Sequence, residues 1–287
     1  MNTSIRDDRI FPETRIAVIP VILVLLSAFI TLFFWPDDTE RLFAWTITPR
    51  MTPLLMASGY LAGAYAFSHL LIRGVRWHHV AFSFLAVEPF TVAMAGATIL
   101  HWDRFHHDQI WFWVWVVVYA ATPLLLPVLW LRNRVTDPGT PDPDDALLPK
   151  PARWVLRLGG WVGVALTAFL FLLPEQAIQV WPWTLTPLTA RVIGGWYALS
   201  GATALVIARD PRWSAARIAV RGSLVFAGML LVSIVRAWGD FDPSNLLTWV
   251  YVGTVVFTVA GFGALYAIME SRRKAAARLS GEQSQPA

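Results

Sequence analysis

The sequence contains no cysteine, which excludes disulfides, thiolate nucleophiles and Cys-ligated zinc or iron–sulfur sites in this chain. Charge is scarce as well: Asp, Glu, Lys and Arg make up 15% of the 287 residues, whereas hydrophobic residues make up 56%. An ordinary soluble domain carries about 25% charged residues. The 16 tryptophans and 17 phenylalanines are typical of aromatic belts at two membrane surfaces. The composition therefore indicates an integral membrane protein.

Eight continuous apolar runs each have about the 20 residues that a transmembrane helix needs. We expect an all-α protein with spans at 16–35, 51–72, 79–100, 111–131, 154–173, 188–208, 215–235 and 247–269. The first run is too long for the apolar part of a signal peptide, so we expect it to remain as a helix. Barrel strands are excluded because these runs do not alternate between apolar and polar residues.

Part of the sequence occurs twice. Trp45-Thr46-Ile47-Thr48-Pro49 returns as Trp183-Thr184-Leu185-Thr186-Pro187, a shift of 138 positions. A shift of 136 then places Arg76-Trp77 on Arg212-Trp213, and Trp102 on Trp238. Rare residues that recur in order indicate a duplicated unit. Because each unit holds four spans, the sequence predicts two tandem repeats that enter the membrane in the same direction, in parallel.

These features divide the chain into five segments. The repeats cover 15–131 and 154–271, and a Pro- and Asp-rich linker covers 132–153. We expect this linker to be extended and solvated. The segment 1–14 precedes the first repeat, and the polar tail 272–287 is expected to be disordered beyond its first basic residues.

The Lys and Arg residues predict the orientation. Of the 23 in the chain, all lie on the side of the termini except Arg41, Arg50, Arg104, Arg191 and Arg236. By the positive-inside rule both termini are cytoplasmic, in a plasma or inner membrane. Since the basic residues lie in short loops, nucleic acid is not an expected partner. The expected partners are the lipid bilayer and a small solute or ion, and a homo-oligomer or a membrane partner is left open.

Glu88 is the most informative single residue because it lies near the middle of the third span. A charge at that depth costs about 2.5–3.5 kcal/mol on insertion scales and is usually paired, protonated or exposed to a water-filled cavity. Under the repeat, Arg221 falls within one turn of the same depth. We therefore expect Glu88 and Arg221 to form a pair inside the bundle. A structural salt bridge or a protonated Glu88 would satisfy the same physics.

The repeated Trp-Thr-x-Thr-Pro motif lies on the outer side, just before a span in each half. Thr48 and Thr186 are expected N-caps, and Trp45 and Trp183 are expected interfacial residues. Arg50 and Arg191 follow the motifs closely. Two helix N-termini that each carry an arginine could instead hold an anion between the halves.

All six histidines lie in the first half, and no cofactor is expected. Only His69 lies well inside a span, whereas a membrane haem needs two facing histidines. The outer loop holds His101, Asp103, His106, His107 and Asp108, whose side chains are of the kinds that bind zinc, manganese or iron. Their spacing matches no dedicated metal motif, and the second half does not repeat them, so we expect no metal site.

Three functions fit the sequence. A transporter or channel for a small solute, ion or lipid, with its site between the repeats, fits the duplication and the intramembrane charges. A non-catalytic membrane subunit or scaffold is the alternative. A metal-dependent membrane enzyme is the least favoured, because it would need the outer His/Asp loop to bind metal. No loop is long enough to fold as a soluble catalytic domain.

The orientation can be tested with a reporter that is active only outside the cytoplasm. Fused after Ser280, it should be silent, and inserted near Asp38 or Asp240 it should be active. Activity at Ser280 would contradict the number of spans or their direction.

Overall fold

The computed structural model describes residues 6–142 and 145–283, and the described chain is helical without strands. Eight helices are long and apolar enough to cross a membrane, and each begins within about one turn of its expected position. They are α1 (Pro12–Phe34), α3 (Met51–Ser68), α4 (Trp77–Leu100), α5 (Ile110–Asn133), α6 (Lys150–Leu172), α8 (Pro187–Arg209), α9 (Trp213–Arg236) and α10 (Leu246–Gln283).

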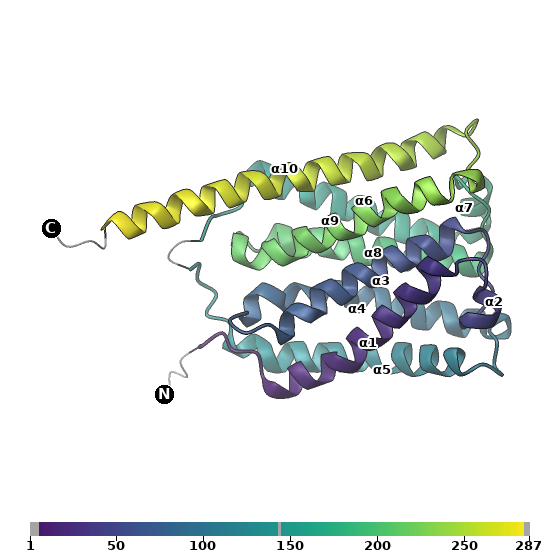
Figure 1. The fold of residues 1–287 in the computed structure, drawn as a ribbon, viewed down its shortest axis with the longest axis horizontal. Coiled ribbons are helices and arrows are strands. Elements are labelled where there is room, and N and C mark those ends of the chain that lie inside the picture. The colour runs from purple at the N-terminus through teal and green to yellow at the C-terminus, as the bar shows by residue number, and fades with distance from the viewer. Residues whose placement is uncertain (1–5, 143–144, 284–287) are drawn as a thin grey trace.

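Short elements join the long helices. Each half has a brief helix after its first span, α2 (Thr39–Leu42) and α7 (Pro174–Val180). Single 3-10 turns occur at η1 (His69–Leu71), η2 (Trp102–Arg104), η3 (Arg134–Thr136) and η4 (Trp238–Asp240). In Figure 1 both described ends of the chain lie at one end of the bundle, and α2 and α7 lie at the other. We call these the terminal end and the opposite end.

Four helices form the centre of the bundle and four surround it. Within the apolar windows, 44–61% of the residues of α3, α4, α8 and α9 are buried, but only 11–28% of those of α1, α5, α6 and α10. The exposed residues of the outer helices are themselves apolar, such as Leu124 and Phe257. An apolar outer surface is what a helix facing lipid presents, and it explains why these spans are apolar on every side.

The outer helices contact helices of their own half, whereas the inner helices contact helices of the other half. The outer helices pack within their own half, α1 on α3, α5 on α4, α6 on α8 and α10 on α9. The inner helices pack across halves, since α4 lies along α8 and α9 lies along α3, and α4 also contacts α9.

Equivalent contacts occur in both halves at the opposite end. Each half buries a tryptophan against two aromatic rings, Trp45 against Phe105 and Trp115 in the first half, and Trp183 against Phe241 and Tyr251 in the second. The loops repeat a further bond: the indole of Trp113 donates to the His107 carbonyl, and that of Trp249 donates to the Pro243 carbonyl, both at 3.0 Å. These are the positions that the shifts of 138 and 136 relate.

The expected linker, 132–153, is helical at both ends, whereas its described residues 137–142 and 145–149 form no helix. This non-helical part is bound to the bundle instead of being surrounded by solvent. The Leu148 amide donates to the Pro211 carbonyl at 2.8 Å, and the Ala146 carbonyl accepts from the Trp213 amide at 2.9 Å. Ala146 and Leu148 are buried. Apolar residues within a polar segment provide this attachment, because their burial offsets the entropy lost when the linker is ordered.

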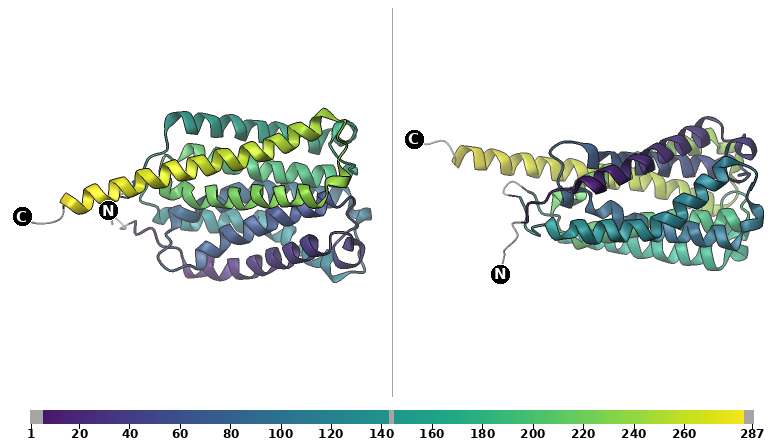
Figure 2. Two further views of the ribbon diagram at one scale, coloured as in Figure 1. Left: turned by 45° about the horizontal axis from the view of Figure 1, so that its top comes forward. Right: turned by 90° about the horizontal axis from the view of Figure 1, so that it is seen from below.

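The expected disordered tail is also helical over part of its length. α10 continues to Gln283, beyond the predicted end of its span, and Figure 2 shows its last turns projecting past the other helices. The expectation of disorder from residue 272 was therefore wrong over 272–283. The stretch Arg272–Leu279 consists of Arg, Lys, Ala and Leu, which are among the best helix formers.

Glycines allow α6 and α8 to approach each other closely. A Cβ atom added at Gly163 would lie 2.8 Å from the Gly201 Cα atom, which is backbone and cannot turn aside. A Cβ atom at Gly159, one turn earlier on α6, would meet nothing within 4 Å. Small residues at a helix–helix contact are a common device of membrane proteins.

We therefore expect Gly163→Ala to destabilise the protein by about 1–3 kcal/mol, the usual range for overpacking. Gly159→Ala removes a glycine from the same helix without a clash, so it should leave stability unchanged or slightly raised. Thermal unfolding of the two variants in detergent measures the difference. Equal melting temperatures would show that α6 and α8 do not pack through this glycine.

Candidate functional site

A cavity of about 470 Å³ opens at the terminal end, between the two halves. The first half contributes η1, the turn after it and the start of α4, the linker contributes two aspartates, and the second half contributes α9 and α10. Arginine is the commonest residue in its wall. The charged and histidine side chains that line it are His69, Arg73, Arg76, His79, Asp142, Asp145, Arg217, Arg221 and Arg273.

Three of the five arginines are paired with carboxylates. Arg76 forms ion pairs with Asp142 and, at 3.9 Å, with Asp8. Arg217 and Arg273 both reach Glu270 of α10, at 2.8 and 3.2 Å. These contacts order the wall of the cavity and neutralise part of its charge.

The other two arginines, Arg73 and Arg221, lie within 4.0 Å of none of the carboxylates that the structure describes. Arg73 is exposed in the turn before α4. Arg221 lies on α9, eight residues after the helix begins and so about 12 Å along its axis. The cavity therefore has an excess of positive charge, part of it well inside the bundle.

Two tyrosines surround the Arg221 guanidinium. Its Nε donates to the Tyr266 hydroxyl at 3.0 Å, and its centre lies 5.1 Å from the Tyr266 ring. The Tyr65 hydroxyl of α3 also interacts with it. Hydroxyl and ring contacts stabilise the cation without neutralising it. In a membrane, an arginine without a counter-ion is costly and usually serves a function.

His79 supplies a further hydrogen-bond donor. Its Nδ1 accepts the backbone N–H of Arg76 at 3.2 Å, so a neutral His79 ring carries its proton on Nε2. His79 lines the cavity. With its proton on Nε2 the ring offers a hydrogen-bond donor, which favours ligands that accept hydrogen bonds.

Three side chains beside the cavity are of the kinds that bind metal ions. Ligand atoms of His78, His79 and Asp142 lie within 4.8 Å of one another, the only such group among the described residues. However, His79 Nε2 is protonated in the neutral tautomer, Asp142 pairs with Arg76, and His78 Nε2 lies 2.9 Å from the Ser214 hydroxyl. A metal would have to break all three arrangements, so the donor set fits an anion better than a cation.

A chain of hydrogen bonds joins the two halves beside the cavity. Asp8 lies at the start of α4, where its carboxylate accepts the His78 backbone N–H at 3.0 Å and contacts His78 Nδ1. Asp145 does the same at the start of α9, accepting the Ser214 backbone N–H at 3.0 Å and its hydroxyl at 2.6 Å. The His78–Ser214 contact then links α4 to α9.

The order Asp8, His78, Ser214 resembles a hydrolase triad, but its hydrogen bonding does not. A carboxylate only accepts hydrogen bonds, so the Ser214 proton points to Asp145 and not to His78. A serine nucleophile needs its proton on the histidine side. The chain is therefore a structural link between two capped helices.

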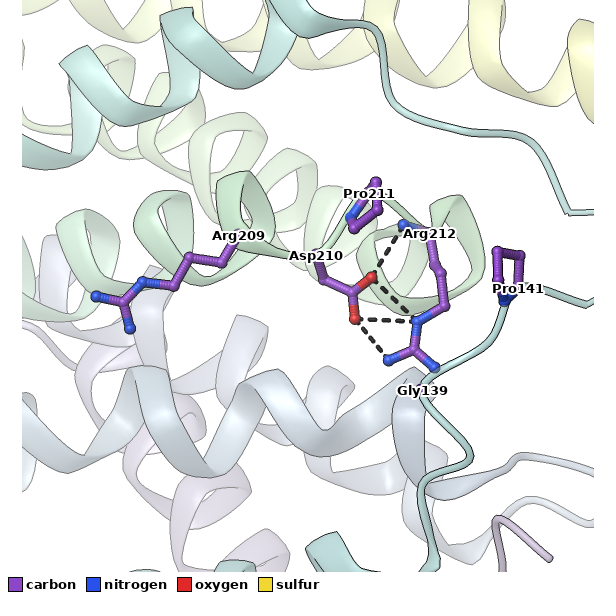
Figure 3. Close-up of a pocket in the computed structure, with 6 residues that line it drawn as sticks. All are labelled: Gly139, Pro141, Arg209, Asp210, Pro211 and Arg212. Carbon is purple, nitrogen blue, oxygen red and sulfur yellow. Dashed lines mark hydrogen bonds and ion pairs between the residues drawn. The ribbon is translucent and has the colours of Figure 1, made fainter. Parts of the chain in front are cut away.

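A second, shallower pocket of about 340 Å³ lies beside the linker (Figure 3). Its central side chain is Arg212, which bonds Asp210 at 2.6 Å and Asp137 at 2.8 and 3.0 Å. Although burial opposes ionisation, the bonds from Arg212 and the Gly139 N–H hold the pKa of Asp137 below its usual value. Two carboxylates thus neutralise Arg212, which makes this pocket the weaker candidate for a ligand.

The structure does not join Glu88 to Arg221. No ion pair connects them within 4.0 Å, and the buried Oε2 atom of Glu88 has no hydrogen-bond partner. Arg221 bonds the tyrosine of α10 instead. Equivalent depth along α4 and α9 did not bring the side chains together, because depth does not specify the face on which a residue lies.

The tryptophans of the repeated motif are buried inside the protein and do not lie on its outer surface. Trp45 is 2% exposed and Trp183 is 3% exposed, each within the aromatic cluster of its own half. The Trp183 indole crosses to the first half and donates to the Thr52 hydroxyl at 2.9 Å. The loops fold inward over the helix ends and so bury these rings, whereas tryptophans such as Trp154 and Trp161 are exposed.

The two motif threonines differ in role. Thr186 is the N-cap of α8, and it exchanges hydrogen bonds with Thr189 as expected. Thr48 is not an N-cap, because α3 begins at Met51 after Arg50. The Met51 amide instead donates to the Asp240 carboxylate of the second half, at 2.7 Å.

The two motif arginines have separate partners. Arg50 pairs with Asp37 at 2.5 Å and is exposed, whereas Arg191 donates to the Phe171 carbonyl at 3.1 Å and contacts His101 Nε2 at 2.6 Å. Burial and the nearby Arg191 cation hold the pKa of His101 below its usual value. The shared outer anion site stays a prediction, and no common partner supports it.

The outer histidines also have individual partners. His106 contacts the Thr46 hydroxyl at 3.2 Å, and His107 contacts the Trp102 carbonyl at 2.9 Å. Among the described residues they belong to no metal-sized group. The metal-dependent enzyme therefore gains no support from this loop.

Sequence reasoning missed most of the cavity. Asp8, Arg73 and Asp145 were not singled out. One signal was available: the shift of 136 places His78 on Ser214, and a shift of 137 places Asp8 on Asp145. Polar residues at related positions before two spans would have pointed to this end of the bundle.

Comparison with family models, curated proteins and solved structures finds no match to this chain. The fold and the eight apolar helices are those expected of a multi-pass membrane protein.

The separation of Glu88 from Arg221 predicts independent effects. In a double-mutant cycle of Glu88→Gln and Arg221→Met, the changes in unfolding free energy should add to within about 0.5 kcal/mol. Thermal or denaturant unfolding of the four proteins in one detergent measures the coupling. A double mutant that recovers much of either loss would show that the two side chains meet.

Proposed function

We propose that the protein is a membrane transporter for a small anionic solute, and that the cavity at the terminal end is its binding site. The observation that carries this proposal is the pair of uncompensated arginines, Arg73 and Arg221, in a cavity lined by both halves. An ion site between two repeated units is a recurrent arrangement in transporters.

The proposal includes two tandem repeats that cross a plasma or inner membrane in the same direction, with both termini in the cytoplasm. The duplicated motif and the equivalent aromatic clusters support the repeats. The excess of Lys and Arg supports the orientation. In that orientation the cavity faces the cytoplasm.

The alternative is a membrane subunit that binds an anion without moving it. Tight packing in the middle of the bundle favours this alternative. A Cβ atom added at Gly59 would lie 2.1 Å from the Trp196 ring, and Trp196 packs against Tyr60 and Phe90 with centroids 5.1 and 4.4 Å apart. A transporter would have to separate these groups to let a solute pass.

Transport can be measured as transient current from proteoliposomes on a solid-supported membrane, with chloride, acetate, phosphate and glycerol phosphate tested in turn. We expect at least one anion to give a current that Arg221→Met abolishes. Arg134→Gln is the matched control, because Arg134 is an exposed arginine at the same end that stacks on Trp130 outside the cavity.

A folded wild-type protein that binds an anion but gives no current with any of them would favour the non-transporting subunit. A current unchanged by Arg221→Met would contradict the assignment of the cavity as the site.

A further inference from the structure

We propose that the cavity at the terminal end binds a phosphate ester, with the phosphate held by Arg73, Arg221 and the Nε2–H of His79. This inference rests on the proposed function and specifies the chemistry of its ligand.

The donors in the wall of the cavity come from separate segments of the chain, which favours phosphate. Arg73 belongs to the turn before α4, His79 to the first turn of α4 and Arg221 to the third turn of α9. A phosphate accepts hydrogen bonds through oxygens that point in several directions and carries up to two negative charges. A carboxylate presents one planar edge, which a single arginine satisfies.

The ion pairs among the side chains of the cavity also favour a phosphate ligand. Asp142 and Asp145 also line the cavity, but Asp142 is bound to Arg76 and Asp145 to the start of α9. Arg217 and Arg273 are held by Glu270. The arginines of the cavity without a carboxylate partner among the described residues are therefore Arg73 and Arg221, and these are the cations that a phosphate can contact directly.

The size of the cavity favours an ester over the free ion. Cavities of about 300–1,000 Å³ accommodate whole small organic molecules. At about 470 Å³ this one leaves room for an organic group beside the phosphate. Ile218 supplies an apolar side chain in the same wall.

The phosphate ester can come from a soluble metabolite or from a lipid. Basic pockets between transmembrane helices bind anionic headgroups. The chemistry recognised is the same for both sources, so the experiment has one arm for each.

The soluble arm uses the full-length protein in phosphatidylcholine nanodiscs, titrated calorimetrically with glycerol phosphate, inorganic phosphate and acetate. We expect glycerol phosphate to bind most tightly. Arg73→Gln and Arg221→Met should each weaken it by about tenfold or more, which corresponds to the loss of one charge-assisted hydrogen bond. Arg134→Gln should bind as the wild type does.

The lipid arm counts adducts by native mass spectrometry after reconstitution with phosphatidic acid or with phosphatidylcholine alone. Retention of phosphatidic acid that Arg73→Gln and Arg221→Met reduce, without binding of glycerol phosphate, would assign the site to a lipid headgroup. Arg73 is exposed, so Arg73→Gln reports on the site even if Arg221→Met does not fold.

Three results would overturn the inference. Acetate that binds as tightly as glycerol phosphate would leave an anion site without preference for phosphate, and the proposed transport of an anion would survive. Binding of phosphate esters that neither variant weakens would place the ligand elsewhere. If no anion and no anionic lipid binds, both proposals fail.

Discussion

The contact between His78 and Ser214 joins the first turns of α4 and α9, and the arrangement of the terminal end depends on it. Each helix begins beside an aspartate from a distant part of the chain, Asp8 of the N-terminal segment for α4 and Asp145 of the linker for α9. Each carboxylate accepts an orphan backbone N–H of the first turn. Because these segments also carry buried hydrogen bonds to the helix ends, the N-terminal segment and the linker are held against the bundle. The start of α4 and the start of α9 therefore stay adjacent, and the cavity forms beside them.

The charge of the cavity follows from this arrangement. The aspartates that approach it are occupied by helix capping and by Arg76, so they do not neutralise the arginines that lie deeper. Glu270 satisfies Arg217 and Arg273 from α10. Arg221 is one turn beyond Arg217 on α9, where α10 offers Tyr266 in place of an acid. A tyrosine can orient the guanidinium but leaves its charge available to a ligand.

The site was harder to predict than the helices, and Glu88 and Trp45 show why. The repeat placed Glu88 and Arg221 at similar depths, but a contact also requires that their helices present those faces to each other. Trp45 was assigned to the membrane surface because tryptophan near a helix end is common there. In the structure a loop folds over that helix end and buries the ring against Phe105 and Trp115. Both outcomes depend on contacts between segments far apart in the chain.

The sequence by itself determined the number of long helices and their approximate limits, and it predicts a division into two similar halves. These depend on local properties, namely the length of apolar runs and the recurrence of rare residues, which no tertiary contact alters. Only the tertiary structure decided that α4 packs on α8 and α9 on α3, that the linker is bound to both halves, and that Arg73, His79 and Arg221 share one cavity. The physical reason is that every span is apolar, so hydrophobicity cannot specify which helices are neighbours. Glycine contacts, helix caps and a few ion pairs make that choice, and each requires residues that only the folded chain brings together.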